Sequence, residues 1–242
     1  MERVPPRSGL DRRQVLALLA RGGALLVVGC GTSSEPSGCV LAPAMTAGPY
    51  WHDDGLHRAD LRWDSPPVGE DDPLPGVPLS LTVRVTTPSE DSCHALRGAR
   101  VDLWQCDAQG LYSGVPDRGT AGRDFLRGYQ VTADAGEVRF LTVYPGWYPG
   151  RTVHIHAKVR TFDPFGLVVT EVSTQLFFDD AVTDAVLATE AYAGRAPRDT
   201  RNATDAILAG QPARLVSVTG DVESGMQGEV ELGVRIGDIH RE

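Results

Sequence analysis

Short runs in which apolar and polar residues alternate recur along the chain from residue 79 onward. Turn-forming stretches separate them, such as Asp134-Ala135-Gly136 and Asp163-Pro164-Phe165-Gly166. Alternation with a period of two is typical of a strand that buries one face. The runs are 79–86, 99–105, 128–132, 138–143, 152–161, 167–178, 214–219 and 228–236. Many short strands at this spacing predict an all-β fold, an antiparallel β-sandwich with long loops.

Helical patterns are few. One short helix is predicted over 180–192 and a second near 200–209. With 242 residues, the chain is long enough for one good core, and we predict a single β-sandwich domain over 39–242. No glycine-rich phosphate loop follows a strand and no Gly-x-Ser-x-Gly elbow is present, so the sequence does not support nucleotide binding or serine hydrolysis.

The N-terminus predicts a targeting segment over 1–29 and a flexible tether over 30–38. Asp11-Arg12-Arg13-Gln14-Val15-Leu16 is a twin-arginine pattern, and the apolar stretch after it is too short and interrupted to span a bilayer. Val27-Val28-Gly29-Cys30 resembles a bacterial lipoprotein cleavage box; the alternative is an ordinary cleaved signal with a chance cysteine. We therefore expect export by the twin-arginine route to the cell surface or the extracellular space, with Cys30 as a possible lipid anchor.

Net charge and cysteine content narrow the partners and the compartment. A net charge of -9 argues against nucleic acid or an anionic membrane surface as a partner, so membrane contact is expected only through the anchor. After Cys30, the remaining cysteines are Cys39, Cys93 and Cys106. In an oxidising compartment we expect one disulfide and one free thiol, with the pair left open. The oligomeric state is also open.

The candidate chemistry lies in the segment 144–156. His154 and His156 stand two apart in a run rich in β-branched residues, so on a strand both imidazoles leave from one face while Val153, Ile155 and Ala157 face a core. Tyr148 in the same segment and Tyr112 in Gly110-Leu111-Tyr112-Ser113 add two phenols. Phenols bind metal as phenolates, which favours a strong Lewis acid such as Fe(III).

Other interpretations of these residues remain open at this stage. A His-x-His pair on a strand also occurs on solvated faces and in zinc or cupin-type sites. The two tyrosines also fit ordinary half-buried positions with satisfied hydroxyls. A zinc or copper cupin-like enzyme would need a further glutamate and a distant histidine, for which the sequence offers no convincing candidates.

Five blocks of sequence, taken in order, resemble the intradiol ring-cleavage dioxygenases, the family of protocatechuate 3,4-dioxygenase and catechol 1,2-dioxygenase. The resemblance covers about residues 39–215. The blocks are Thr46-Ala47-Gly48-Pro49-Tyr50-Trp51, the stretch 98–113 with Leu103-Trp104-Gln105-Cys106-Asp107 and Gly110-Leu111-Tyr112-Ser113, Phe125-Leu126-Arg127-Gly128-Tyr129-Gln130, the segment 144–156, and Ser173-Thr174-Gln175-Leu176-Phe177-Phe178.

The resemblance implies non-haem Fe(III) held by Tyr112, Tyr148, His154 and His156. It also implies Arg151 and Gln175 as catalytic residues, with Tyr148 leaving the metal when substrate binds. The implied reaction inserts both atoms of O2 into a catechol-type aromatic and gives a muconate-type product. Arg127 and Gln130 are weaker candidates for supporting the pocket. The salt bridge of Arg151 to a loop carboxylate is the alternative role for that residue.

The chain departs from the family pattern at three points. Gln105 stands where a histidine is usual and Ala47 where a glutamate is usual, and the gap from Tyr148 to His154 is short. These departures bear on the shape of the pocket, because neither substituted position is an iron ligand in the resemblance. The chain resembles the exported, single-domain branch of the family. The main rival interpretation is an exported β-sandwich binding lipoprotein with a non-catalytic metal site.

Overall fold

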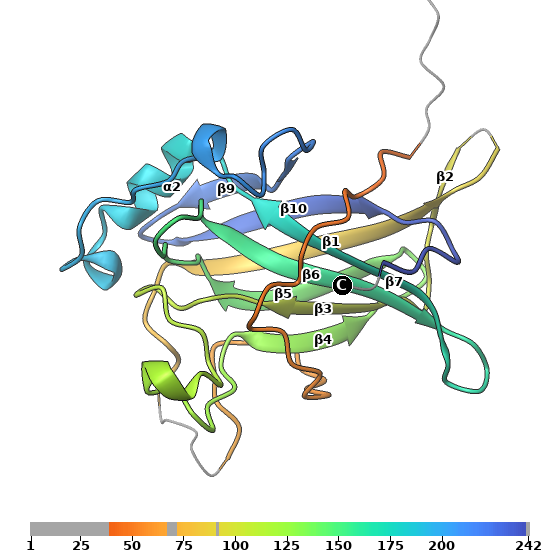
Figure 1. Cartoon of the computed structure of the whole chain (residues 1–242), viewed down its shortest axis with the longest axis horizontal. Helices are drawn as coiled ribbons and strands as arrows, with labels where there is room; N and C mark the ends of the chain where they lie inside the picture. The colour runs from red at the N-terminus through yellow and green to blue at the C-terminus, as the bar shows by residue number, and fades with distance from the viewer. Residues whose placement is uncertain (1–38, 67–71, 91, 241–242) are drawn as a thin grey trace, which may run out of the picture. The chain divides into compact units, whose positions relative to one another are not determined.

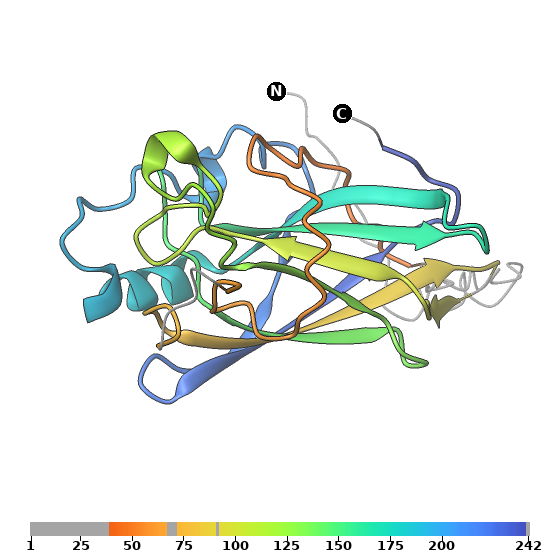
Figure 2. The ribbon, with the colours of Figure 1, turned by 90° about the horizontal axis from the view of Figure 1, so that it is seen from below.

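Two sheets packed face to face form the fold and are seen as two layers in Figure 2. The computed structural model describes residues 39–66, 72–90 and 92–240. Across these residues, the first sheet contains β2 (Cys93–Ala95), β1 (Pro78–Pro88), β10 (Gly225–Gly233) and β9 (Ser217–Asp221) in that order, with β5 (Glu137–Val143) also paired to β1. The second sheet has the order β4 (Arg127–Val131), β3 (Arg100–Trp104), β6 (His154–Phe162), β7 (Val168–Phe177) and β8 (Arg214–Leu215).

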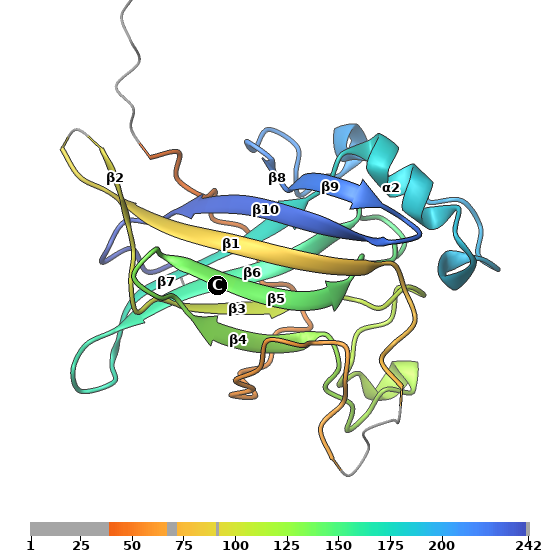
Figure 3. The ribbon, with the colours of Figure 1, turned by 180° about the vertical axis from the view of Figure 1, so that it is seen from behind.

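The core lies between the two sheets, as the alternating pattern predicts. In β1, Leu79, Leu81, Val83 and Val85 are buried, while most of the residues between them face outward. Figure 3 shows β1 between β10 and β5. The all-β sandwich is confirmed, with one difference in pairing. β1 runs parallel to β10, and β7 runs parallel to β8, whereas the prediction had only antiparallel pairs.

Strand β6 is buried on both faces. Val153, just before the strand, and Ile155 and Ala157 within it belong to the main hydrophobic core, as predicted. The opposite face of β6 is covered by the segment 39–66, which is orange in Figure 1 and crosses the second sheet. Lys158 on this face lies 4.5 Å from the centre of the Trp51 ring. Side chains on this face of β6 are thus shielded from water although they are polar.

Within residues 39–66, 72–90 and 92–240, helical structure is limited to short segments beside one end of the sandwich (Figures 1 and 2). Helix α2 (Asp180–Leu187) begins after Asp179, whose side chain accepts a hydrogen bond from Ala181 N at 2.7 Å, as an N-cap does. It is followed by the 3-10 turn η2 (Glu190–Tyr192), and together the two match the predicted helix over 180–192. The second predicted helix, near 200–209, forms only the 3-10 turn η3 (Asn202–Thr204) and further turns.

The cysteine pair left open by the sequence is Cys39–Cys93, and Cys106 is the buried free thiol of the described residues. This disulfide ties the start of the described chain to β2. The predicted targeting segment 1–29, the tether 30–38 and the lipid anchor at Cys30 lie outside the described residues. Among the residues that the structure describes, no helix has the length and apolar character needed to cross a membrane.

Candidate active site

Three separate segments bring the four predicted ligand residues together at one end of the second sheet. His154 and His156 lie on β6, on the face turned away from the core. Tyr148 lies in the loop between β5 and β6, and Tyr112 lies in the long loop between β3 and β4. The antiparallel pairing of β3 with β6 places the end of β3 opposite His156, so the loop that follows β3 begins beside the two histidines.

The donor atoms of these residues converge. Tyr148 Oη lies 3.1 Å from His154 Nε2, and His154 Nε2 lies 3.1 Å from His156 Nε2. The Tyr112 ring meets the Tyr148 ring edge-on, with 5.7 Å between ring centres, and lies 6.1 Å from the His156 ring. The Tyr112 hydroxyl is buried and makes no hydrogen bond of ordinary geometry with a described residue; the other candidate ligand, Tyr148, is the hydroxyl close enough to affect its pKa. A buried hydroxyl without a partner costs free energy, which a metal ligand role would remove.

Burial keeps both imidazoles neutral. It lowers the pKa of His154 to about 3 and lowers the pKa of His156 well below its ordinary value. His154 Nδ1 lies 2.7 Å from the carbonyl oxygen of Thr152, which can only accept, so Nδ1 carries the proton. The lone pair of His154 is then on Nε2 and faces His156 Nε2. Fixing one nitrogen through a backbone carbonyl is the usual way in which proteins orient a histidine ligand.

The two phenols decide which metal suits the site. Burial raises the pKa of Tyr148 to about 12 and raises the pKa of Tyr112 well above its ordinary value. Only a strong Lewis acid would deprotonate such phenols. The described residues hold no group of three or more His, Cys, Asp or Glu that would bind a metal without them. Two imidazole nitrogens with two phenolic oxygens therefore fit Fe(III) and lack the third histidine, carboxylate or thiolate typical of zinc.

Arg151 and Gln175 contact each other beside this cluster. Gln175 lies directly opposite His156 in the pairing of β7 with β6 and is fully buried. Its Oε1 accepts a hydrogen bond from Arg151 Nη2, and its Nε2 donates to the Thr46 carbonyl oxygen at 2.9 Å. The structure thus brings the two predicted catalytic residues together through a direct contact. The register of β6 and β7, which sequence does not reveal, explains why Gln175 faces the site.

Asp205 holds Arg151 in place. Its side chain is fully buried, and its Oδ2 accepts hydrogen bonds from Arg151 Nε at 2.9 Å and from Thr152 N at 2.8 Å. Its Oδ1 accepts from the backbone N–H groups of Ile207 and Leu208. Burial alone would raise the pKa of Asp205, but these N–H donors and the charge of Arg151 hold it below its ordinary value. Nothing in the sequence identified this residue, which lies far from Arg151 along the chain.

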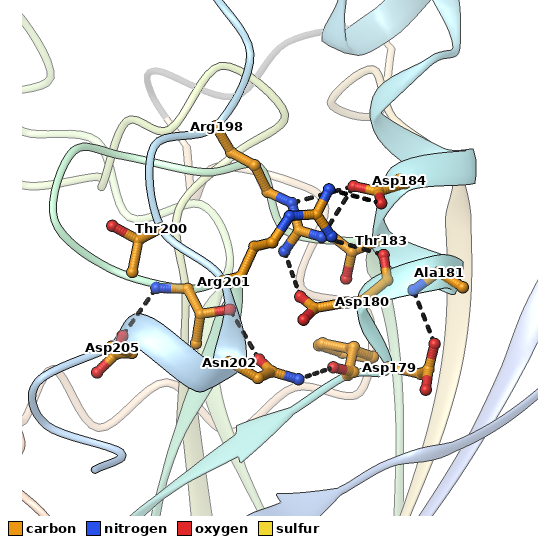
Figure 4. Close-up of polar contacts among 12 residues, drawn as sticks. Asp179, Asp180, Ala181, Thr183, Asp184, Arg198, Thr200, Arg201, Asn202 and Asp205 are labelled. Atoms are coloured by element: carbon orange, nitrogen blue, oxygen red, sulfur yellow. Dashed lines mark hydrogen bonds and ion pairs between the residues drawn. The ribbon is translucent and has the colours of Figure 1, made fainter.

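The chain segment that carries Asp205 is anchored to α2. In Figure 4, Arg198 and Arg201 reach the acidic side chains of that helix. Arg198 binds Asp180 at 2.6 Å and Asp184 at 2.8 Å, and Arg201 binds Asp184 at 2.9 Å. The Arg198 side chain is only 4% exposed, but Asp180 and Asp184 are 30% and 45% exposed, so these ion pairs are only partly shielded from water. The network fixes the position of the loop from which Asp205 reaches the site.

Aromatic rings pack around the candidate ligands. Tyr50 stacks on Tyr112 with 4.4 Å between ring centres, and Trp104 stacks on His156 at 4.9 Å with the planes 7° apart. Arg127, a weaker sequence candidate, is buried and bonds to Ser113 and to the Tyr50 carbonyl oxygen. It therefore connects the two segments on either side of the stacked tyrosines. No comparable contact places Gln130, on β4, at the site.

The two substituted family positions have structural roles away from the donor atoms. Gln105 is fully buried, and its side chain donates to the Val143 carbonyl oxygen at 2.8 Å and accepts from Thr142 Oγ1 at 3.1 Å. It ties the end of β3 to β5. Ala47 is buried in a small cluster with Trp104, Cys106 and Tyr112. Neither residue lines the cavity described next.

A cavity of about 600 Å³ opens beside the cluster. Tyr112, Tyr148, His156 and Arg151 form part of its wall. Apolar side chains, Leu111 among them, form another part. An apolar cavity with a few convergent polar groups is typical of a small-molecule site. The volume is several times that of one aromatic ring with two hydroxyl groups.

Comparison with known proteins finds dioxygenases by sequence and by structure. A protein-family model described as Dioxygenase matches residues 47–197. An intradiol ring-cleavage dioxygenase from Tetranychus urticae is 29% identical, with a TM-score of 0.68 and coverage of 84% of this chain and 98% of that chain. The dioxygenase domain of a dioxygenase carbohydrate-binding protein fusion from Streptomyces sp. SirexAA-E is also 29% identical, with a TM-score of 0.56 and coverage of 81% and 99%.

One sequence relative matches over a shorter region. A chlorocatechol 1,2-dioxygenase from Pseudomonas putida is 31% identical over 119 residues, which cover 41% of this chain and 42% of that protein. The match thus spans less than half the length of that relative.

Proposed function

The chain belongs to the intradiol ring-cleavage dioxygenase family, and on this basis we propose that it is a non-haem Fe(III) enzyme acting on a catechol-type aromatic. The proposed reaction cleaves the ring between the two hydroxylated carbons and places both atoms of O2 in a muconate-type product. The observation that carries the proposal is the buried convergence of two phenols and two neutral imidazoles at the wall of a cavity.

Tyr112, Tyr148, His154 and His156 would hold the iron. The unpartnered hydroxyl of Tyr112 and the two facing Nε2 atoms support this set. Bound there, ferric iron would supply Lewis acidity that draws electron density from the catecholate and makes its ring reactive toward O2.

Tyr148 is suited to take a proton from the substrate. A catechol must lose two protons to bind as a dianion, and phenolate oxygen is a base of suitable strength. Tyr148 lines the cavity, and it is the phenol whose Oη lies near His154 Nε2. We assign it the role of holding one catechol proton at Oη.

Arg151 would stabilise the negative charge that builds up on the substrate during ring opening. Arg151 lines the cavity, and its planar guanidinium can donate to several oxygens at once. Asp205 and Gln175 bind its Nε and Nη2, while Nη1 has no partner among the described residues. A charge fixed in this way needs little reorganisation when the reaction proceeds. Gln175 orients Arg151 from a buried position opposite His156, behind the cavity wall.

The visible spectrum of the purified, iron-loaded protein tests the proposal. Tyrosinate coordination to Fe(III) gives a visible charge-transfer band, and anaerobic addition of catechol should shift it to longer wavelength. Admission of O2 should then yield a muconate. A protein that stays colourless after loading with ferrous or ferric iron would overturn the proposed site and leave a binding protein as the better account.

A pair of tyrosine variants tests the ligand set. Tyr112→Phe should lose the iron or show a weaker and shifted band, because it removes one of the two phenolic oxygens and little else. Tyr129→Phe is the matched control, since Tyr129 lies on β4 and stacks on His57. Full iron content and an unchanged band in Tyr112→Phe would remove Tyr112 from the metal site.

We also propose that the protein is exported by the twin-arginine route and anchored through Cys30. Support comes from the sequence pattern alone. Arg12→Lys with Arg13→Lys should leave the protein in the cytoplasm of the producing cell, and Cys30→Ala should release it from the membrane fraction. Unchanged fractionation of both variants would contradict the proposal.

A further inference from the structure

Two arginines in the cavity wall have no part in the proposed metal site. Arg118 ends the 3-10 turn η1 (Pro116–Arg118), and Arg195 lies in the loop after η2. Both line the same cavity as Arg151, and the lining contains no Asp or Glu among the described residues. This acid-free wall belongs to a chain with a net charge of -9. The described lining thus carries three arginines and no carboxylate, and the acid that interacts with Arg195, Asp107, lies behind the wall.

Arg195 is held in a fixed position. Its Nη1 donates a hydrogen bond to the Trp147 carbonyl oxygen at 2.6 Å, and its guanidinium lies 4.4 Å from the centre of the Trp147 ring. Gly110 allows this approach, because a Cβ at that position would lie 2.9 Å from Arg195 Nη1. No described residue accepts a hydrogen bond from Nε or Nη2. Arg195 thus keeps a pair of donors available in a preorganised orientation.

Arg118 is exposed, and no described residue pairs with its guanidinium. Most arginines in the described part of the chain have a carboxylate partner, among them Arg58, Arg62, Arg84, Arg97, Arg100, Arg123, Arg151, Arg160, Arg198 and Arg201. An unpaired arginine at a cavity rim attracts anions and orients them as they enter.

We propose that the cavity is built for catechols whose ring carries a side chain ending in a carboxylate. That the ligand contains a catechol ring rests on the proposed function. Arg195 would bind the carboxylate through Nε and Nη2 in the two-pronged geometry that guanidinium and carboxylate share, with Arg118 adding charge at the rim. The cavity has room for such a side chain beyond the ring, and Leu111, Val115 and Ile207 would cover the ring and its methylene groups.

Matched acids and amides test this proposal. The acids are 3,4-dihydroxyphenylacetate and 3-(3,4-dihydroxyphenyl)propanoate, and the neutral probes are their primary amides. Two quantities are measured for each, kcat/KM with O2 and the calorimetric dissociation constant under anaerobic conditions. We expect wild type to favour at least one acid over its amide by about tenfold or more, the scale of a charge-assisted hydrogen-bond pair. The preference should shrink as NaCl is raised.

Variants identify the residues responsible for the preference. Arg195→Gln should reduce the acid-to-amide ratio by about tenfold and Arg118→Gln by about threefold, because the exposed charge is screened. Arg195→Lys keeps the positive charge but loses the planar pair of N–H donors that can bind both carboxylate oxygens. It should therefore give an acid-to-amide ratio between those of wild type and Arg195→Gln. Arg97→Gln removes the same charge from an exposed pair with Asp134 and should leave the ratio at the wild-type value.

The outcomes separate this inference from the proposed function. If wild type cleaves both acid and amide with equal kcat/KM and binds them equally, the anion site is wrong and the dioxygenase proposal stands. If no catechol is cleaved and no visible band appears, the dioxygenase proposal fails, and calorimetry alone decides the anion site. A preference for acids that survives in Arg195→Gln and Arg118→Gln would overturn the assignment of these residues.

Discussion

At the scale of single residues, one carboxylate organises much of the candidate site. Asp205 fixes Arg151 through Nε and Thr152 through its backbone N–H. Thr152 in turn accepts from His154 Nδ1, which leaves Nε2 free to face the cluster. A guanidinium and a histidine tautomer thus depend on the same buried acid. We regard Asp205 as a positioning residue, since it acts through its neighbours.

Asp205→Asn should therefore slow turnover without removing iron. The amide loses the charge that holds Arg151, so we expect kcat to fall by about tenfold or more, with a smaller change in KM. The visible band should persist, because all four candidate ligands remain. Iron content, the spectrum and steady-state kinetics are the measurements. Equal kcat in the variant and wild type would remove Asp205 from the mechanism.

Asp184→Asn is the matched control for this variant. It makes the same chemical change in the network of Figure 4, but Asp184 contacts Arg198 and Arg201 and not Arg151. Its side chain is 45% exposed, so little stability is at stake. We expect Asp184→Asn to turn over near the wild-type rate while Asp205→Asn is slow. This result would show that the loss in Asp205→Asn comes from the position of Arg151 and not from a general loosening of the loop.

The depressed pKa of Asp205 also predicts a pH dependence of stability. Because the folded-state pKa lies below the unfolded value, the ionised carboxylate stabilises the folded protein fully above the unfolded value of about 3.9. That contribution is lost as pH falls from there through the folded-state value. In urea unfolding at pH 7, the free energy of unfolding of wild type should exceed that of Asp205→Asn by about 3 kcal/mol. The gap should narrow below about pH 4; a gap that widened on acidification would contradict this account.

The sequence predicted which residues would come together, but not the residues that support them. The two histidines and Tyr148 lie in one short segment, and Tyr112 follows a recognisable strand end, so their types and order were enough to propose them as a group. Asp205 and Arg195 were not identifiable, because each reaches the site from a distant loop through contacts that depend on the fold. The Cys39–Cys93 pair was open for the same reason.

At the scale of elements, alternation predicted the strands that form the core but not all of their pairings. The run 79–86 became β1, and the run 152–161 became β6. The three-residue β2 is too short to show an alternating apolar pattern. The parallel pairing of β1 with β10 joins two strands that lie far apart in the sequence, which alternation does not reveal. The predicted helix near 200–209 is replaced by turns. The Asp205 side chain accepts hydrogen bonds from the backbone N–H groups of Ile207 and Leu208, which would otherwise donate to carbonyl oxygens within a helix.

Two loops meet at Gly110, and we expect this contact to govern the distance between Tyr112 on one loop and Tyr148 on the other. Gly110 has φ +78, and a Cβ there would lie 2.2 Å from the Trp147 carbonyl oxygen. Gly110→Ala should therefore push the two tyrosine-bearing loops apart. We expect weaker iron retention and a diminished visible band. The free energy of unfolding should also fall by clearly more than the cost of a non-glycine residue at positive φ, which is about 1 kcal/mol. Iron titration and urea unfolding measure these effects.

Gly119→Ala separates strain from clash in that experiment. Gly119 has a nearly identical φ of +76, but a Cβ at that position would have no heavy atom within 4 Å, so the substitution introduces only the backbone cost. It should unfold at slightly lower urea and keep its iron. If Gly110→Ala behaved like Gly119→Ala in both measurements, the contact between the two loops would not control the metal site.

At the scale of the whole molecule, the site depends on a segment that belongs to neither sheet. Residues 39–66 cross the second sheet (Figure 1). Within them, Tyr50 stacks on Tyr112 and Trp51 packs against Trp104. This segment has few pairings of its own, and isolated bridges such as Leu41 with Gly233 tie it to the strands. Backbone hydrogen bonds, such as Met45 N to the Ser173 carbonyl oxygen and Leu61 N to the Leu141 carbonyl oxygen, and the ion pairs of Asp53 with Arg100 and Arg160 also hold it, together with the disulfide at its start.

The disulfide should stabilise the molecule mainly by restricting the unfolded chain. Cys39 and Cys93 are 54 residues apart, and closing a loop of that length is worth about 4 kcal/mol in the chain-entropy model. Cys39→Ser with Cys93→Ser should lose stability up to that amount, and wild type in reductant should unfold at the same urea concentration as the double variant. Burial raises the pKa of the Cys106 thiol, so this cysteine should resist alkylation until the protein unfolds. If the reduced protein kept its full stability, residues 39–66 would be held by their noncovalent contacts alone, and an oxidising compartment would no longer be needed for the folded site.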